Sequence, residues 1–76
     1  MMHPATAAQL CPNATAYIQK ITDPALEKRL CDMGILPGAR VTFVRRAPLG
    51  DPCILATDAC VIALRERDCR NILLCP

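Results

Sequence analysis

Six cysteines are the residues of this 76-residue chain best suited to chemistry, because a thiolate is both a nucleophile and a ligand for soft metals. In a secreted chain of this length, an even number of cysteines would predict a disulfide framework. The first dozen residues, MMHPATAAQLCP, lack the basic start of a signal peptide. We therefore expect a cytoplasmic protein with free thiols at Cys11, Cys31, Cys53, Cys60, Cys69 and Cys75.

The cysteine spacing gives little support for a metal site. Structural zinc sites usually hold two ligands two to four residues apart, and the closest pairs here, Cys53 with Cys60 and Cys69 with Cys75, are wider. A site made from these four residues would have to be assembled across strands, so they are minor candidates. We expect no resident metal or cofactor, and we interpret most of the cysteines as small buried apolar residues.

Other signatures of catalysis are missing from the sequence. The chain has no serine, no Gly-rich phosphate loop and no HExxH motif, and its one histidine is His3 in a terminus that we expect to be solvated. The nearest candidates for a nucleophile are Cys69, between Asp68 and Arg70, and Cys31 near the end of a predicted helix. The negative end of a helix disfavours a thiolate, which speaks against Cys31. We expect that the protein is not an enzyme.

Composition narrows the class of protein further. The chain is one domain over residues 1–76, and a domain of this size has little room for a deep enclosed site. We expect residues 1–9, which are small and polar and lack a periodic pattern, to be loosely packed. It is 53% hydrophobic but has Tyr17 and Phe43 as its only aromatic residues, so we expect an aliphatic core. No apolar stretch is long enough to cross a bilayer. Neither membrane insertion nor a further domain is expected.

The net charge of +2 is too small to indicate a nucleic acid partner. A basic nucleic acid surface would also be helped by exposed aromatic residues for base stacking, and the chain has none to spare. Acidic residues are interleaved with the basic ones near the predicted strands. We therefore interpret as a solvated rim the side chains of Arg40, Arg45, Arg46, Arg65, Arg67 and Arg70.

Residues 23–34 carry the signals of a short helix that must position the middle of the chain. Asp23 can cap a free backbone N–H, and Pro24 fits the first helical position because it has no N–H to leave unpaired. Leu26, Leu30 and Met33 recur at helical spacing and share one face. Gly34 suits the left-handed residue that ends a helix, so it should close this one.

Two Pro-Gly turns flank a predicted strand over residues 40–46. Residues 36–39, Leu-Pro-Gly-Ala, match a type II turn, with proline at the second position and glycine at the third. The strand RVTFVRR is rich in β-branched and apolar residues. Residues 47–52, APLGDP, end it in a stiff, exposed bend.

The remaining segments predict a small antiparallel sheet. We expect strands at residues 14–21, 53–57, 60–65 and 72–74, with residues 66–70 forming a polar turn or a single helical turn. A two-residue turn at 58–59 would pair Cys53 with Leu64 across a hairpin, and the last strand would pair back near the first. The element order β-α-β-β-β-β, mainly β with one short helix and no βαβ repeat, indicates a partly open antiparallel barrel.

The sequences MGILPG at 33–38, APLGDP at 47–52 and VIALR at 61–65 resemble the FeoA family. These are small cytosolic accessory proteins of bacterial ferrous iron transport, and the resemblance runs from about residue 14 to residue 74. It implies an SH3-like barrel with the helix inserted after the first strand. It also implies a non-enzymatic cytosolic protein that docks on the ferrous iron permease FeoB, at its GTP-binding domain.

Two other functions stay open. The same barrel is, by resemblance, the C-terminal domain of metal-dependent DtxR-type repressors, so the chain can be interpreted as a regulatory domain of that kind. The high number of cysteines departs from the family pattern and leaves room for a thiol-based metal or redox carrier. Self-association is an open alternative as well, since exposed leucines and strand edges favour it.

Each Pro-Gly turn contains a leucine that we expect to be exposed, and a rigid apolar tip loses little entropy when it docks. We expect Met33, Leu36 and Leu49 to line a shallow apolar groove between the helix and the barrel, with Arg45 and Arg46 orienting the partner. The predicted partner-binding residues are Met33, Leu36, Pro37, Gly38, Arg45, Arg46, Pro48, Leu49, Gly50, Asp51 and Pro52.

Overall fold

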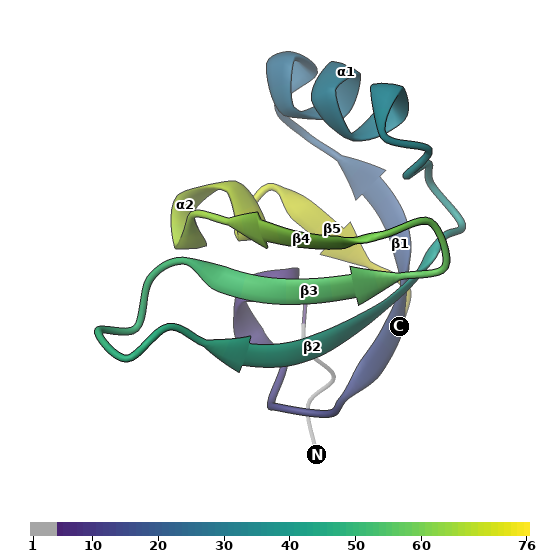
Figure 1. The fold of residues 1–76 in the computed structure, drawn as a ribbon. Coiled ribbons are helices and arrows are strands. Elements are labelled where there is room, and N and C mark those ends of the chain that lie inside the picture. The colour runs from purple at the N-terminus through teal and green to yellow at the C-terminus, as the bar shows by residue number, and fades with distance from the viewer. Residues whose placement is uncertain (1–4) are drawn as a thin grey trace.

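The computed structural model describes residues 5–76, which form one curled five-stranded sheet with the order β4-β3-β2-β1-β5 (Figure 1). All neighbouring strands are antiparallel. The strands are β1 (Thr15–Ile21), β2 (Arg40–Arg46), β3 (Cys53–Thr57), β4 (Val61–Leu64) and β5 (Ile72–Leu74). Helix α1 (Pro24–Asp32) follows β1, and the single turn α2 (Glu66–Cys69) precedes β5. Because β4 and β5 are the two edges, the barrel is partly open, as the sequence predicted.

Strand β1 serves two neighbours and bends between them. Its first three residues pair with β2, and its second half pairs with β5, with a shift of register between Ile18 and Lys20. The shift explains why Ile18 and Ile21 are both buried although they are three residues apart. The irregular alternation in this strand therefore has a structural cause.

Helix α1 begins where the capping signals placed it. The Asp23 carboxylate accepts a hydrogen bond from the backbone N–H of Ala25 at 3.2 Å, and Pro24 occupies the first turn. Leu26 and Leu30 are buried against the sheet. Met33, predicted on the same face, is instead 42% exposed. It is the C-terminal cap residue, where the chain has left the helical conformation, so the helical spacing no longer applies.

The end of α1 forms a Schellman motif. Gly34 has φ of +82°, and its N–H donates to the carbonyl of Cys31 at 3.0 Å. The N–H of Ile35 donates to the carbonyl of Leu30 at 2.8 Å, and the Ile35 side chain is fully buried. The predicted stop at Gly34 is confirmed, and the motif turns the chain back toward the sheet.

Both predicted turns, at residues 36–39 and 58–59, are present. The N–H of Ala39 donates to the carbonyl of Leu36 at 2.9 Å, and Gly38 has φ of +93°, as a type II turn requires. At the β3–β4 hairpin, the N–H of Thr57 donates to the carbonyl of Cys60 at 2.8 Å. Cys53 pairs with Leu64 across that hairpin.

The prediction of a loosely packed N-terminal stretch is wrong for residues 5–9. A 3₁₀ turn, η1 (Ala7–Gln9), packs there with Ala7 fully buried, and the carbonyl of Ala5 accepts a hydrogen bond from the N–H of Leu74 at 3.0 Å. Small residues without a periodic pattern gave no signal, but Ala7 and Leu10 help to fill the core of the barrel. His3 lies in residues 1–4, outside the described part of the chain.

The core is aliphatic, as predicted, apart from Phe43 and two cysteines, Cys53 and Cys69, and within residues 5–76 no polar or charged side chain is fully buried. Tyr17 is half exposed and lies outside it. No helix in the described part of the chain is long and apolar enough to cross a membrane. The buried residues include Ile18, Leu26, Leu30, Ile35, Val41, Phe43, Cys53, Leu55, Cys69 and Ile72.

Candidate functional site

The loop between β2 and β3, residues 47–52, projects beyond the sheet at the left of Figure 1. Its backbone is braced by two hydrogen bonds, from the N–H of Gly50 to the carbonyl of Ala47 at 2.7 Å and from the N–H of Ala47 to the carbonyl of Pro52 at 3.0 Å. Leu49 lies at the tip and is 96% exposed. The loop therefore presents an apolar side chain on an ordered support.

The base of this loop is tied to α2. The carboxylate of Asp51 accepts a hydrogen bond from the N–H of Glu66 at 3.0 Å and lies 4.0 Å from the guanidinium of Arg65. Asp51 thus caps the start of α2 in its own chain, although the sequence analysis placed it among the predicted partner-binding residues. A carboxylate at the start of a helix satisfies one of the backbone donors that the helix leaves unpaired.

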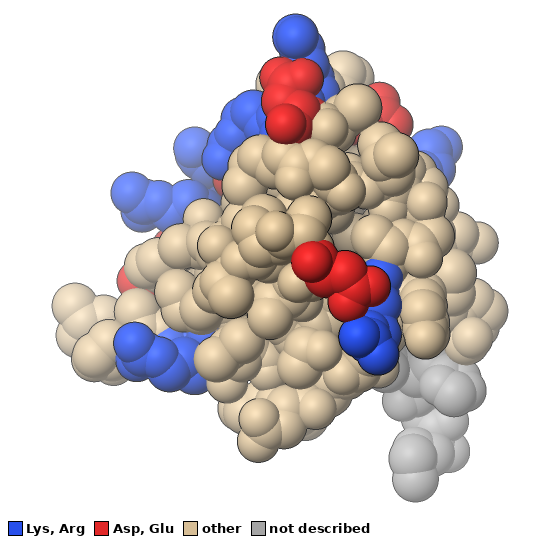
Figure 2. All heavy atoms as spheres, turned by 45° about the vertical axis from the view of Figure 1, so that its right-hand side comes forward, with Lys and Arg blue, Asp and Glu red and all other residues tan. Residues whose placement is uncertain are grey.

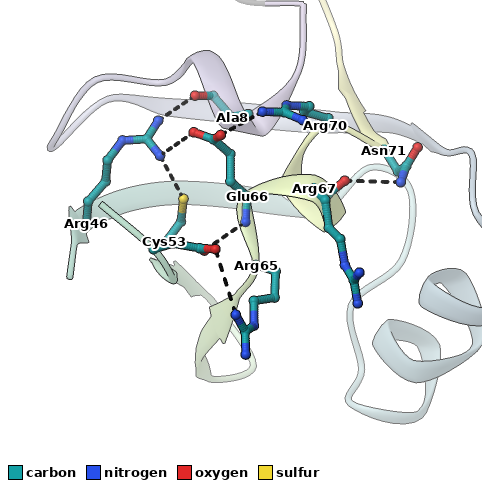
Figure 3. Close-up of polar contacts among 9 residues, drawn as sticks. Ala8, Arg46, Cys53, Arg65, Glu66, Arg67, Arg70 and Asn71 are labelled. Carbon is teal, nitrogen blue, oxygen red and sulfur yellow. Dashed lines mark hydrogen bonds and ion pairs between the residues drawn. The ribbon is translucent and has the colours of Figure 1, made fainter. Parts of the chain in front are cut away.

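Arg46 is the centre of a polar network inside the protein (Figure 3). Its guanidinium donates to the carbonyl of Ala8 at 2.7 Å, to the carboxylate of Glu66 at 3.0 Å and to the sulfur of Cys53 at 3.1 Å. It also lies 5.1 Å from the centre of the Phe43 ring, within cation–π range. These contacts join η1, β2, β3 and α2, so Arg46 is a structural link rather than a free cation.

Arg45, its neighbour in β2, is exposed. The register between β2 and β3 shifts between Phe43 and Arg45. Successive side chains of a strand point to opposite faces, so the two adjacent arginines, which the sequence treated as a pair, differ in environment: Arg45 is exposed and Arg46 is half-buried.

A second apolar feature is a groove of about 420 Å³ between α1 and the turn that follows it. Leu36, which was predicted to line a groove, is 51% exposed and belongs to it together with Pro37. The helical part of the lining was not predicted from the sequence, although Pro24, Lys28 and Cys31 recur at helical spacing and so share a face. The groove is lined by Ile21, Pro24, Glu27, Lys28, Cys31, Asp32, Ile35, Leu36 and Pro37.

The structure does not bring the two leucine turns together. One turn enters β2 and the other leaves it, and the seven residues of the strand separate them by about 20 Å. Figure 1 shows the β2–β3 loop at one side of the sheet and the connection from α1 to β2 at the other. The expected common groove for Met33, Leu36 and Leu49 is therefore wrong. Sequence order placed both turns beside β2 but did not show that they lie at opposite ends of it.

The cysteines divide into two groups. Cys53 and Cys69 are fully buried, as the interpretation of cysteine as a small apolar residue predicts, and Cys60 is half-buried. Cys11, Cys31 and Cys75 are exposed, so the interpretation is wrong for them. Cys11 lies in a turn, Cys31 lies on the solvent-facing side of α1, and Cys75 follows the last strand. All three positions are outside the core.

The four cysteines kept as metal candidates are not one cluster. Within residues 5–76, no three His, Cys, Asp or Glu side chains gather in a way that could hold a metal ion. Burial raises the pKa of Cys69 to about 12, and the neighbouring Cys53 adds to the shift, while Arg46 lowers the pKa and Asp68 raises it. At neutral pH, Cys69 is thus a protonated thiol, which is the opposite of what a nucleophile needs.

Four of the six arginines interpreted as a rim form ion pairs with interleaved acids, namely Arg40, Arg46, Arg65 and Arg70. Arg40 lies 3.0 Å from Asp58, and Arg70 lies 2.7 Å from Glu66. Figure 2 shows blue and red side chains close together around a wide uncharged face, rather than a continuous basic surface. A shallow polar hollow of about 440 Å³ near α2 is lined by Asp51, Arg65, Glu66, Arg67 and Arg70.

The sequence matches a family model described as "FeoA domain" over residues 6–75. Among solved structures, the fold is similar to a FeoA protein from Chlorobium tepidum, with a TM-score of 0.85 and 27% identity over 91% of this chain and 67% of that one. It is also similar to FeoA of Stenotrophomonas maltophilia in complex with zinc, described as an SH3-domain protein. That structure has a TM-score of 0.80 and 22% identity, over 95% of this chain and 91% of that one.

A third similar structure is a manganese-dependent transcriptional repressor, with a TM-score of 0.82 and 18% identity. The match covers 97% of this chain but 42% of the repressor. At this identity the likeness concerns the fold alone, which is an SH3-like barrel in the FeoA relatives as well.

Proposed function

The chain belongs to the FeoA domain family, and on this premise we propose that it is a cytoplasmic accessory protein of ferrous iron uptake that docks on the GTP-binding domain of a FeoB-type permease. The similar protein from Stenotrophomonas maltophilia is described as a candidate ferrous iron transport activating factor. A small SH3-like barrel with rigid loops is suited to binding another protein. Docking would act on the permease without any chemical step in the accessory protein itself.

Leu49 is the observation that carries the proposed docking surface. Leu49 is 96% exposed at the tip of a braced loop, so a partner with an apolar pocket would bury nearly the whole side chain. Because the backbone of residues 47–52 is already fixed by hydrogen bonds, docking would freeze little additional motion. Arg45 is the adjacent exposed cation, and it would favour an acidic rim around an apolar pocket on the permease.

A calorimetric titration tests the proposal. The protein is titrated with the GTP-binding domain of the permease from the same organism, with and without a non-hydrolysable GTP analogue. We expect saturable binding by the wild-type chain. The Leu49→Asp variant should lose affinity by at least about 30-fold, because a central apolar contact of this kind is worth about 2 kcal/mol or more.

The Val61→Asp variant is the matched control. Val61 is 67% exposed on the edge strand β4, so the substitution removes a comparable apolar side chain from another surface. It should leave the affinity within about twofold of the wild type, because surface residues outside the contact contribute little. If the folded wild-type chain does not bind in either nucleotide state, docking on this domain is ruled out.

The groove beside α1 is the competing surface on the same protein, and a Leu36→Asp variant measures it in the same titration. If Leu36→Asp abolishes binding while Leu49→Asp does not, the chain still docks, but through the groove. Equal losses in both variants would require a partner that reaches both ends of β2. The three variants therefore separate the function from the location of its surface.

A regulatory domain of the repressor type is the second candidate, favoured by the match of 97% of this chain to a manganese-dependent repressor. Such a domain would bind a proline-rich segment of its own or another protein through the barrel. Titration with a proline-rich peptide tests this, and the permease domain serves as the competitor. Binding of the peptide together with indifference to the permease would favour the regulatory interpretation.

A further inference from the structure

The polar hollow beside α2 adjoins the loop that carries Leu49. Asp51 belongs to that loop and also lines the hollow, which has a volume of about 440 Å³. Glu66, the first residue of α2, lines it as well. The other lining residues are three arginines from one short segment of the chain, namely Arg65, Arg67 and Arg70. The fold therefore places a group of guanidinium side chains directly beside the proposed docking loop.

The two carboxylates of the hollow are already bound within the protein. Asp51 accepts the backbone N–H of Glu66 at 3.0 Å. One oxygen of the Glu66 carboxylate accepts a hydrogen bond from Arg46 at 3.0 Å, and the other accepts one from Arg70 at 2.7 Å (Figure 3). Both oxygens of Glu66 therefore have a cationic partner, and Glu66 has little capacity to neutralise further arginines.

Two guanidinium groups of the hollow have a weak internal partner or none. Arg65 lies 4.0 Å from Asp51, and its side chain is 71% exposed. The Arg67 side chain forms no ion pair within residues 5–76, since its hydrogen bond to Asn71 is accepted by the backbone carbonyl. Both side chains extend in the same direction in Figure 3, away from the network around Arg46. Positive charge is therefore available to a partner on this side of α2.

The chemistry of the hollow suits carboxylates. A guanidinium group presents parallel N–H donors that match the two oxygens of a carboxylate, and it is less strongly hydrated than an ammonium group. With Arg46 included, four arginines stand against two carboxylates, which leaves two positive charges. Because the hollow and the Leu49 loop share Asp51, a single partner surface can contact both.

We propose that this hollow binds an acidic segment of the protein partner, in which Asp or Glu carboxylates pair with Arg65 and Arg67 while Leu49 enters an apolar pocket beside them. The inference rests on the proposed docking function, and it names the chemistry of the partner surface. It also gives a binding role to arginines that the sequence indicated only as a solvated rim. Attraction of this kind increases the rate of association and weakens with salt.

The test adds an Arg67→Glu variant to the calorimetric titration with the permease domain. At about 50 mM salt we expect a loss of affinity of about 10-fold, because a repulsive charge replaces an attractive one. At about 500 mM salt the difference from the wild type should fall below about twofold, because salt screens exposed charges. The variant should stay folded, since the Arg67 side chain forms no ion pair in the described part of the chain.

Lys20→Glu is the matched control. Lys20 is exposed on β1 and does not line the hollow, and its substitution changes the net charge by the same amount. It should keep the affinity within about twofold of the wild type. Equal losses in Lys20→Glu and Arg67→Glu would reflect net charge and overturn the hollow as the site. If Leu49→Asp loses binding at low salt while Arg67→Glu does not, the docking function stands and the hollow has no part in it.

A hexaglutamate peptide separates the hollow from the docking function if the permease domain does not bind. The peptide is titrated into isotope-labelled protein, and the amide signals of residues 65–70 are followed by NMR. Shifts that are lost in Arg67→Glu would retain the acidic preference of the hollow although docking on the permease has failed. An absence of shifts would overturn both proposals. Shifts caused by pyrophosphate but not by the peptide would assign the hollow to a phosphate ligand and overturn the acidic segment.

Discussion

The two ends of β2 are built from similar sequence but held by different forces. At one end, the turn at residues 36–39 follows a Schellman motif whose Ile35 side chain is buried in the core. At the other end, the loop at residues 47–52 rests on a polar network centred on Arg46. Both ends carry an exposed leucine beside proline and glycine.

This difference shows that turn residues fix the local shape of the chain but not what supports it. Apolar burial supports the helix end, so its stability should depend on volume and shape. Charged hydrogen bonds support the loop end, so its stability should depend on a few donors and acceptors. Substitutions at equivalent places in the two ends can therefore test whether the distinction holds.

The largest effect is expected from Ile35→Ala at the helix end. The substitution removes a fully buried side chain and leaves a cavity, so it should lower the free energy of unfolding by about 3 kcal/mol. Urea denaturation followed by circular dichroism measures the change. Leu36→Ala is the control, because Leu36 is half exposed and should cost less than about 1 kcal/mol. Similar losses in both variants would contradict the account of this end.

The next largest effect is expected from Arg46→Ala at the loop end. It should lower the free energy of unfolding by about 2 kcal/mol, since the hydrogen bonds to Ala8, Glu66 and Cys53 are lost from a partly buried site. Arg45→Ala, one residue away and exposed, should stay within about 0.5 kcal/mol of the wild type. The free energies of unfolding are measured by thermal and urea denaturation. Equal values for the Arg46→Ala and Arg45→Ala variants would contradict the account of the loop end.

The smallest effects are expected from glycine substitutions, and they should be alike at the two ends. Gly34 and Gly50 have φ of +82° and +91°, so Gly34→Ala and Gly50→Ala should each cost about 1 kcal/mol in backbone strain. An added Cβ meets ordinary contact with Ala59 at 3.5 Å in the first case and open space in the second. A large difference between the free energies of unfolding of Gly34→Ala and Gly50→Ala would show that the contacts around each turn, rather than its positive φ, set the cost.

Local signals in the sequence determined the elements. The cap at Asp23, the stop at Gly34, the type II turn at 36–39 and the bounds of β2 and β3 all follow from short-range rules that the structure confirms. Such signals work because backbone conformation depends mainly on adjacent residues. The barrel and its element order could be inferred from them, and the family resemblance agreed.

Tertiary structure alone decided which residues share a surface. The sequence grouped Met33, Leu36 and Leu49 into one groove, but the length of β2 separates the two turns. It treated Arg45 and Arg46 alike, but Arg46 turns toward η1 and α2 while Arg45 is exposed. The packing of residues 5–9 also left no local trace. These relations join residues far apart in the chain, and they depend on how the sheet curls and closes, which no short stretch of sequence specifies.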